Sequence, residues 1–266
     1  MADKANTVGG RRDHDLLEVL KLRQNLDEPI SCNFSHWRDA RYQPRGYLRK
    51  IAESGGVSEI GLGIFSGSFQ CLENHTSAGS GTIHRSEVLK LGAMYRQGHV
   101  SATDLFLATM VWGNGGTGYG PYRTSVALNI SRKGASPVNV IENVGRLARA
   151  GDIENAYNTM ANALWRIGPA FGTKFLYFAS PVDNQALIFD GVVARWQSAD
   201  SPWPALASTA WSWNWETYRV YLDWCQKKFN ALPAEFKESG RTLFHEDGAS
   251  RVDMVEAAIF SYMNSR

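Results

Sequence analysis

The chain has 266 residues, of which 44% are hydrophobic and 20% are charged. This composition is ordinary for a soluble globular protein, and the length suffices for one large domain or two small ones that share a core. The formal net charge of +2 is low for a DNA-binding protein, because affinity for duplex DNA comes largely from neutralised phosphates. A local basic face can still serve, so the charge does not exclude DNA binding.

The sequence also argues against a membrane protein and a metal protein. No apolar run approaches the length of a membrane span, and the first 15 residues lack the apolar core of a signal peptide. Cys32, Cys71 and Cys225 lie far apart and form no CxxC pair, so they cannot build an iron–sulfur or structural zinc site by themselves. We expect a reduced cytoplasmic protein with no metal and no other cofactor.

Apolar residues at steps of three and four recur along the chain after a tail at residues 1–13 that is predicted to be disordered. They predict helices at about 15–24, 86–97, 101–112, 137–151, 153–167, 175–179, 191–196, 214–231 and 252–263. Because no βαβ rhythm accompanies them, the fold class is mostly α.

A basic segment at residues 32–53 follows the first predicted helix. Aromatic residues are interleaved there with the cations Arg38, Arg41, Arg45, Arg49 and Lys50. The segment contacts a DNA backbone or forms a pocket wall, or it is a solvated helix face. The sequence leaves these interpretations open.

A glycine-rich loop follows the helix predicted to end at Trp112, with five glycines between residues 113 and 120. No GKS or GKT step follows it and no hydrophobic strand precedes it, so it is not a P-loop or a Rossmann turn. We expect it to let the backbone approach DNA or an extruded base closely. The residues that would enter the DNA, clamp phosphates or bond a base edge are Asn114, Tyr119, Tyr122 and Arg123.

A second glycine-containing stretch separates the helices at 153–167 and 175–179. Gly168, Pro169 and Gly172 interrupt the helical pattern there. We therefore predict a helix, a tight hairpin and a second helix. Backbone N–H groups at the start of a helix lack intrahelical partners and can bind a phosphate.

Lys174 opens the second of these helices in this prediction, directly after Gly172 and Thr173, which we expect to contact DNA together with Gly168. Asp190 follows 16 residues later, immediately before the helix at 191–196, where an acid is a natural N-cap. A lysine amine acts as a point charge on phosphate or, in suitable surroundings, as a nucleophile toward a sugar carbon. Asp190 could stabilise positive charge on that sugar as its base departs.

These residues resemble the core of the helix-hairpin-helix DNA glycosylases, and most closely the 8-oxoguanine DNA glycosylases. The resemblance rests on Gly172-Thr173-Lys174, the apolar helix after it, and Asp190 before another helix. The string GPAFGTKFLYFA resembles a bacterial subgroup of 8-oxoguanine-glycosylase-like proteins, and Trp112-Gly113-Asn114-Gly115 fits the WG-x-G loop of that subgroup. The resemblance covers residues 101–196. The interval from Gly168 to Gly172 is two residues longer than the usual Gly-x-Gly hairpin.

The resemblance implies a two-lobed helical domain with the active site between the lobes. The hairpin lobe would cover residues 85–200, and the second lobe residues 14–84 plus 201–266. Aromatic residues of the WG-x-G loop and of a late helix would line the base pocket. By position alone these are Trp112, Trp211, Trp215 and Tyr218.

The resemblance further implies a DNA glycosylase, with possible AP-lyase activity, that acts as a monomer on double-stranded DNA containing a modified base, at the nucleoid. Lys174 would attack C1′ of the damaged nucleoside and Asp190 would assist. The excised base would be 8-oxoguanine, or a bulky modified cytosine of phage DNA if the protein serves antiviral defence. From another class, the chain could be a non-catalytic DNA-binding module. Lys174 would then be a helix-end cation and Asp190 only an N-cap, while Asp183 is a weaker rival to Asp190.

Overall fold

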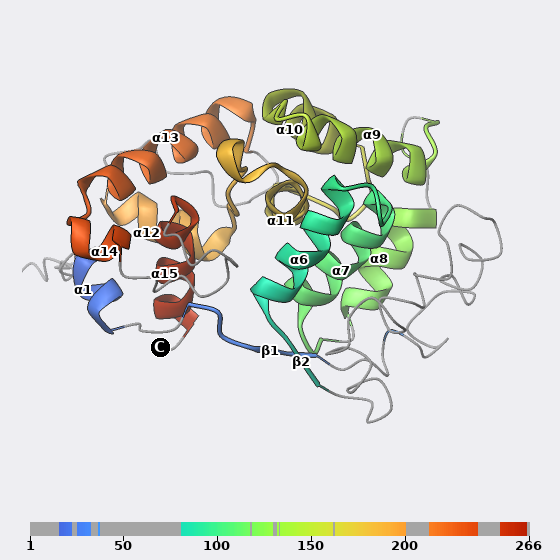
Figure 1. Cartoon of the computed structure of the whole chain (residues 1–266). Coiled ribbons are helices and arrows are strands. Elements are labelled where there is room, and N and C mark those ends of the chain that lie inside the picture. Colours follow the sequence, from blue (N-terminus) through green and yellow to red (C-terminus); the bar gives the residue numbers. More distant parts are fainter. Residues whose placement is uncertain are drawn as a thin grey trace, which may run out of the picture.

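The structure, a computed structural model, describes residues 16–22, 26–32, 37, 81–117, 119–129, 132, 134–161, 163–200, 213–238 and 251–264. The predicted tail at residues 1–13 and the five cations of the basic segment lie outside these residues. The predicted fold class is confirmed, because the described part is mostly helical (Figure 1). Its two strands, β1 (Ile30–Cys32) and β2 (Gly81–Ile83), form an antiparallel pair in which Ile30 lies opposite Ile83.

Helices account for the rest of the regular structure. In chain order they are α1 (Leu16–Leu22), α6 (Arg85–Arg96), α7 (Ala102–Asn114), α8 (Tyr119–Asn129), α9 (Pro137–Arg149), α10 (Ile153–Met160), α11 (Pro169–Ala179), the 3-10 helix η1 (Val182–Asn184), α12 (Gly191–Asp200), α13 (Trp215–Ala231), α14 (Ala234–Glu238) and α15 (Asp253–Asn264).

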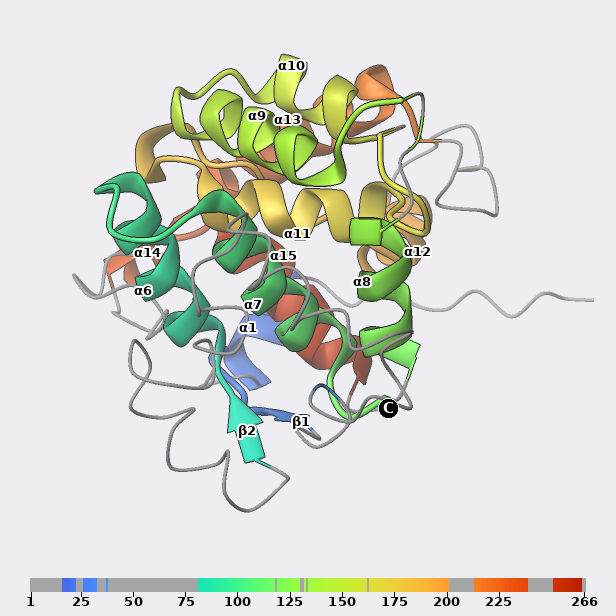
Figure 2. The same ribbon diagram turned by 90° about the vertical axis from the view of Figure 1, so that its right-hand side faces the viewer.

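The helices gather into two groups (Figure 1). In the first, α6, α7, α9 and α10 pack on α11, which runs through the middle of the group (Figure 2). In the second, α1, α12 and α13 pack on α15. The chain crosses from one group to the other within residues 180–190, so α12 lies with the second group, whereas the predicted hairpin lobe extended to residue 200. The rings of Trp196 in α12 and Tyr262 in α15 form a T-shaped contact with centroids 5.5 Å apart, which packs α12 on the second group.

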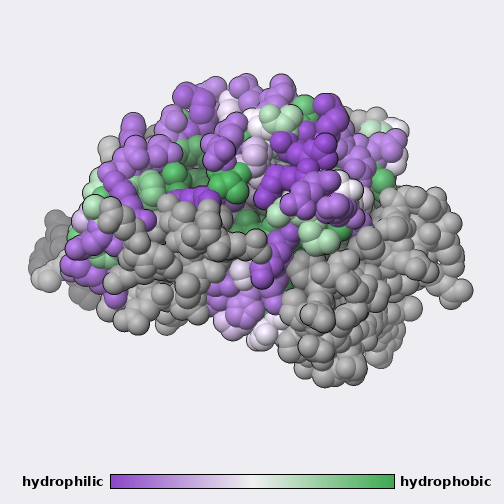
Figure 3. Space-filling view, in the orientation of Figure 1, coloured by the Kyte–Doolittle hydropathy of each residue, from purple (hydrophilic) through white to green (hydrophobic). Residues whose placement is uncertain are grey.

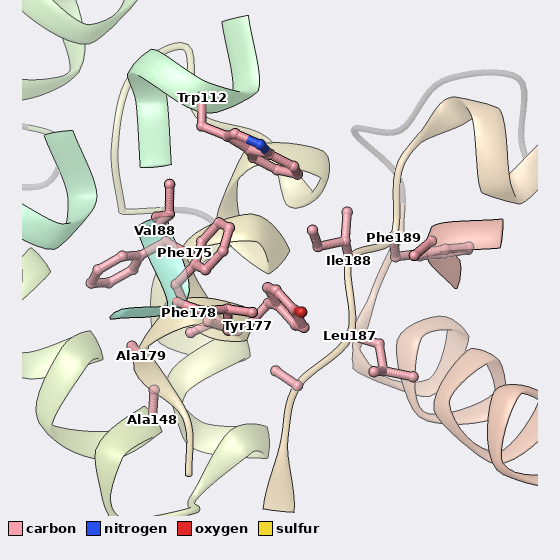
Figure 4. Close-up of a cluster of buried hydrophobic side chains, with 14 of the residues drawn as sticks. Val88, Trp112, Ala148, Phe175, Tyr177, Phe178, Ala179, Leu187, Ile188 and Phe189 are labelled. Atoms are coloured by element: carbon pink, nitrogen blue, oxygen red, sulfur yellow. The ribbon is translucent and has the colours of Figure 1, made fainter. Parts of the chain in front are cut away.

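α11 is buried on all sides. Four consecutive side chains of this helix have no exposed surface: Phe175, Leu176, Tyr177 and Phe178. Phe175 meets Phe106 edge-on with ring centroids 5.6 Å apart, and Phe178 meets Trp112 at 5.3 Å (Figure 4). Each such side chain contributes roughly 1.5–3 kcal/mol by burial. A helix that is apolar all round belongs inside a protein, and the direction of each of its side chains is therefore fixed by packing.

The hairpin lies earlier in the chain than predicted. α10 ends at Met160, residues 161 and 163–168 belong to the turn, and α11 begins at Pro169. Proline suits the first helical position because its φ is preset and its missing N–H would be unpaired there anyway. Gly172 is therefore inside the helix, where a Cβ would lie 3.1 Å from Cγ of Met160, so this glycine allows α10 to approach. Lys174 lies in the second turn of α11 and not at its first residue.

The glycine-rich loop is shorter than predicted. α7 continues through Asn114 and ends at Gly115, whose φ of +56° favours glycine. α8 begins at Tyr119, so the tyrosines and the arginine predicted to contact DNA stand on a helix and not on a loop. Pro121 is compatible with this helix because it lies in the first turn, where proline is tolerated.

Candidate active site

Lys174 and Asp190 form a buried ion pair where the two groups of helices meet. Nζ of Lys174 lies 2.9 Å from Oδ2 of Asp190, and the two residues are only 6% and 8% exposed. Lys174 comes from α11 and Asp190 from the residue that precedes α12. Two residues that are 16 positions apart in the sequence, on different elements, thus meet in the structure.

Asp190 has partners for both carboxylate oxygens. Oδ1 accepts hydrogen bonds from the backbone N–H groups of Val192 and Val193, at 3.0 and 3.2 Å, which confirms the predicted helix cap. Burial on its own would raise the pKa of Asp190, but the Lys174 ammonium and the two N–H donors outweigh it and lower the pKa below its ordinary value. The carboxylate is thus held ionised with Oδ2 directed at the lysine.

Thr173 positions the segment that carries Asp190. Its side chain is fully buried, and its hydroxyl accepts a hydrogen bond from N–H of Phe189 at 3.0 Å and lies 3.3 Å from the carbonyl of the same residue. Thr173 and Lys174 therefore hold two consecutive residues, 189 and 190. The prediction that Thr173 and Gly172 contact DNA is not supported by this geometry, because both are buried within α11. Gly168, at the start of α11, is partly exposed.

Gly113 of α7 makes room for the lysine side chain. A Cβ at this position would lie 3.1 Å from Cδ of Lys174 and 3.0 Å from Cε1 of Phe171. The ring of Phe171 is itself 5.7 Å from Nζ of Lys174. The glycine of the Trp-Gly pair thus lets α7 and α11 approach each other beside the amine.

Gly113 also lines a cavity of about 360 Å³. Its wall combines the end of α7 with residues 26 and 28–30, with Arg85 of α6 and with one face of α15. Trp112 and Asn114, both predicted near the base or DNA, lie in this wall. Asn114 is anchored by a 2.7 Å hydrogen bond from Nδ2 to the carbonyl of Met110. Hydrophobic residues also gather toward the middle of the face in Figure 3, amid a mostly hydrophilic surface.

The other predicted base-pocket residues lie elsewhere. Tyr218 is fully buried and stacks on Tyr157 of α10 at 4.7 Å, and its hydroxyl is bonded to both N–H and C=O of Leu187. Trp215 packs on the same Tyr157 ring at 5.9 Å. The prediction for Trp215 and Tyr218 is corrected accordingly, because they join α13 to α10 and do not border the described cavity. Trp211 lies outside the described residues.

Two half-buried arginines lie against aromatic rings, and one of them is on α8. Arg123 lies between the rings of Tyr119 and Phe171, with its guanidinium carbon 4.8 and 4.3 Å from their centroids. Tyr119 and Tyr122 are 44% and 40% exposed, and their rings lie 5.9 Å apart. Through Phe171 this cluster adjoins Lys174.

The second pair was not predicted. Trp165, in the hairpin turn, is 45% exposed and lies 5.3 Å from the guanidinium of Arg132. Arg166 beside it has a positive φ of 64°, a conformation that non-glycine residues adopt rarely. The sequence contains a signal for this pair, because Trp165 and Arg166 interrupt the apolar pattern at 164–167. Our prediction of one continuous helix at 153–167 does not use that signal.

The described residues contain no group of three or more potential metal ligands. No helix within the described ranges is both long and apolar enough to cross a membrane.

Comparison with known protein families found a match over most of the chain. Residues 27–260 match the family model described as "Putative 8-oxoguanine DNA glycosylase OGG-like protein". The chain belongs to this OGG-like family. The match includes the Lys174–Asp190 pair, the helices from α6 to α14, most of α15, and the cavity wall except Leu26 and Ser261. No curated protein and no solved structure matches the chain.

Proposed function

We propose that this OGG-like protein is a DNA glycosylase in which Lys174 is the nucleophile and Asp190 its partner. The observation that carries the proposal is the buried contact of 2.9 Å between the two side chains. An amine and a carboxylate held together in a dry site can act on a sugar carbon, whereas an exposed lysine would mainly bind phosphate.

In the proposed reaction the Lys174 ammonium gives one proton to the flipped base, and the resulting free amine attacks C1′ of the same nucleoside. The new N–C1′ bond forms while the glycosidic bond breaks, and the electron pair of the broken bond leaves with the protonated base. Ionised Asp190 stabilises the positive charge that develops on the sugar. Ring opening then gives a protonated Schiff base, and β-elimination breaks the C3′–O bond, which accounts for an AP-lyase step.

The cavity beside Gly113 is the proposed site of the extruded base. It adjoins Lys174 through that glycine, and its wall includes the indole of Trp112, the amide of Asn114 and the ring of Phe260. Flipping a base costs a few kcal/mol, and stacking on aromatic side chains offsets this. We propose 8-oxoguanine as the base, on the strength of the family.

The proposed DNA-binding surface runs along α8 and the hairpin. Tyr119 and Tyr122 would fill the space left by the base, while Arg123, Arg132, Trp165 and Gly168 would contact the backbone. Exposed aromatic rings paired with arginines suit this role, because the rings stack on bases or sugars and each guanidinium forms two hydrogen bonds to a phosphate.

A base-release assay tests the proposal. Duplexes carrying 8-oxoguanine, uracil, hydroxymethylcytosine or glucosyl-hydroxymethylcytosine would be incubated with wild-type protein and with Lys174→Gln, and free base measured. We expect release of 8-oxoguanine by the wild type and none by the variant, with duplex binding retained. Release of a modified cytosine alone would show that this base, and not 8-oxoguanine, is the substrate, and it would favour a defence role. Binding without release from any duplex would contradict the glycosylase proposal and would favour a non-catalytic DNA-binding module.

A further inference from the structure

α15 presents two acids to the first group of helices. Asp253 and Glu256 are three residues apart, so they lie on one face of this helix. Both are completely buried. Neither has a part in the reaction proposed above.

Glu256 is paired with Arg85, the first residue of α6. Nη1 and Nη2 of Arg85 donate to Oε2 and Oε1 of Glu256 at 2.7 and 3.1 Å, so the contact is bidentate. The guanidinium also lies 5.4 Å from the ring centroids of both Trp112 and Tyr177. Burial raises the pKa of Glu256 above its ordinary value, although the Arg85 guanidinium opposes that rise. Such a pair fixes distance and direction between α6 and α15, since planar Arg–carboxylate contacts have little geometric freedom.

Asp253 is joined to the helix that carries the lysine. The hydroxyl of Tyr177, in α11, donates to Oδ2 of Asp253 at 2.8 Å. Tyr177 follows Lys174 by three residues and therefore lies on the same face of α11, one turn further along. A rotation of α11 that turned Lys174 away from Asp190 would break this bond.

α15 also supports the other half of the catalytic pair. α12, which Asp190 caps, packs on α15 through contacts such as that between Trp196 and Tyr262. The same helix forms part of the cavity wall through Ala257, Phe260 and Ser261. One helix thus touches the elements that bear the amine, the carboxylate and the proposed base site.

We propose that Asp253 and Glu256 are positioning residues, which hold Lys174 against Asp190 through Tyr177 and Arg85. The inference rests on the proposed function for its catalytic meaning, but the alignment exists in the DNA-free protein and can be measured there. Buried ion pairs contribute little net stability relative to apolar replacements, because desolvation offsets attraction. This network therefore contributes the relative orientation of α6, α11 and α15 rather than net stability.

The test compares Tyr177→Phe with Tyr157→Phe. Each change removes one buried hydroxyl, that of Tyr157 being bonded to the carbonyl of Trp213 at 2.9 Å, away from α15. In the DNA-free protein, the rate of Lys174 acetylation by acetic anhydride would be followed by peptide mass spectrometry. We expect slow labelling in the wild type and in Tyr157→Phe, and labelling several-fold faster in Tyr177→Phe, because the amine is no longer held against Asp190. Equal labelling in all three proteins would overturn the inference, whether or not any base is released.

Single-turnover base release provides the second readout. We expect Tyr177→Phe to lower the rate by about 10-fold with duplex affinity unchanged, since a misplacement of about 1 Å can cost up to ~100-fold. The double variant Arg85→Met/Glu256→Leu removes the ion pair without leaving a buried charge, so it should fold. Arg85 also lines the proposed base site, so this variant is followed by Lys174 acetylation in the DNA-free protein, where we expect labelling several-fold faster than in the wild type. Wild-type labelling of a folded double variant would exclude a positioning role for that pair. If the wild type releases nothing while the labelling rates differ, the positioning stands and the glycosylase assignment fails.

Discussion

Asp190 combines two tasks in one carboxylate, since Oδ1 caps α12 and Oδ2 faces Lys174. Asp190→Asn keeps an oxygen for the cap but places an amide nitrogen against the ammonium. We expect base release to fall on the order of 10²–10⁴-fold, the range for loss of a positioned charged group. The control is Asp152→Asn, an aspartate that caps α10 through N–H of Asn155 without touching the site. Full activity of Asp190→Asn would contradict the catalytic role.

The lowered pKa of Asp190 has a consequence for stability in acid. A carboxyl whose pKa is lower in the folded state stabilises the fold above its unfolded pKa, about 3.9, and loses this contribution as the pH falls through the folded value. We therefore expect the wild type to be more stable than Asp190→Asn at neutral pH, and the difference to shrink below about pH 4. Denaturant titrations of both proteins from pH 7 to pH 3 measure it. A difference that does not change with pH would show that Asp190 is not held ionised by Lys174.

At the scale of elements, Thr173 joins α11 to the segment that precedes α12. Thr173→Val keeps the shape but leaves the buried N–H of Phe189 without its partner, at a cost of about 1–3 kcal/mol. For a chain of this size we expect the melting temperature to fall by roughly 2–4 °C per kcal/mol. Base release should slow as well, because residue 190 is no longer fixed. Thr109→Val is the matched control. The buried hydroxyl of Thr109 donates to the carbonyl of Leu105 within α7, so its removal leaves no buried N–H group without an acceptor. Equal melting temperatures for the two variants would contradict this role.

The same elements show how far the sequence could be interpreted. Helical periodicity predicted most helices, and the order Gly-Thr-Lys followed by an acid at a helix start predicted the pair that the structure brings together. The hairpin was misplaced because Gly172 was interpreted as a turn residue. Sequence pattern cannot distinguish a glycine that bends the chain from one that admits Met160, which comes from a neighbouring helix.

At the scale of the molecule, the contacts between the two groups of helices could not be predicted from the sequence. Arg85 and Glu256 are 171 residues apart, and no local pattern marks either as buried. Likewise, Tyr218 matched the position of a late pocket helix, yet its hydroxyl is bonded to Leu187 in the core. Contacts between distant segments depend on how whole helices pack, whereas spacing in the sequence reports only on single helices and their ends.

The proposed DNA-binding surface also belongs to this scale. Removing a phosphate contact should weaken binding evenly across sequences and reduce the slope of log K against log salt by about 1 per arginine. We expect this for Arg132→Ala and for Arg123→Ala, measured by fluorescence anisotropy at several salt concentrations. Arg219→Ala, on α13 and paired with Glu216 at 2.9 Å, serves as the control and should leave the slope unchanged. An unchanged slope for the first two variants would place the DNA on another face.

The central claim is that the amine of Lys174 becomes bonded to the sugar. Borohydride reduction of a reaction with a duplex containing 8-oxoguanine tests it most directly, because a reduced Schiff base is permanent and can be mapped by peptide mass spectrometry. We predict a covalent protein–DNA adduct on the peptide that contains Lys174, and none with Lys174→Gln. Base release without an adduct, or an adduct that persists in Lys174→Gln, would contradict the assignment of Lys174 as the nucleophile.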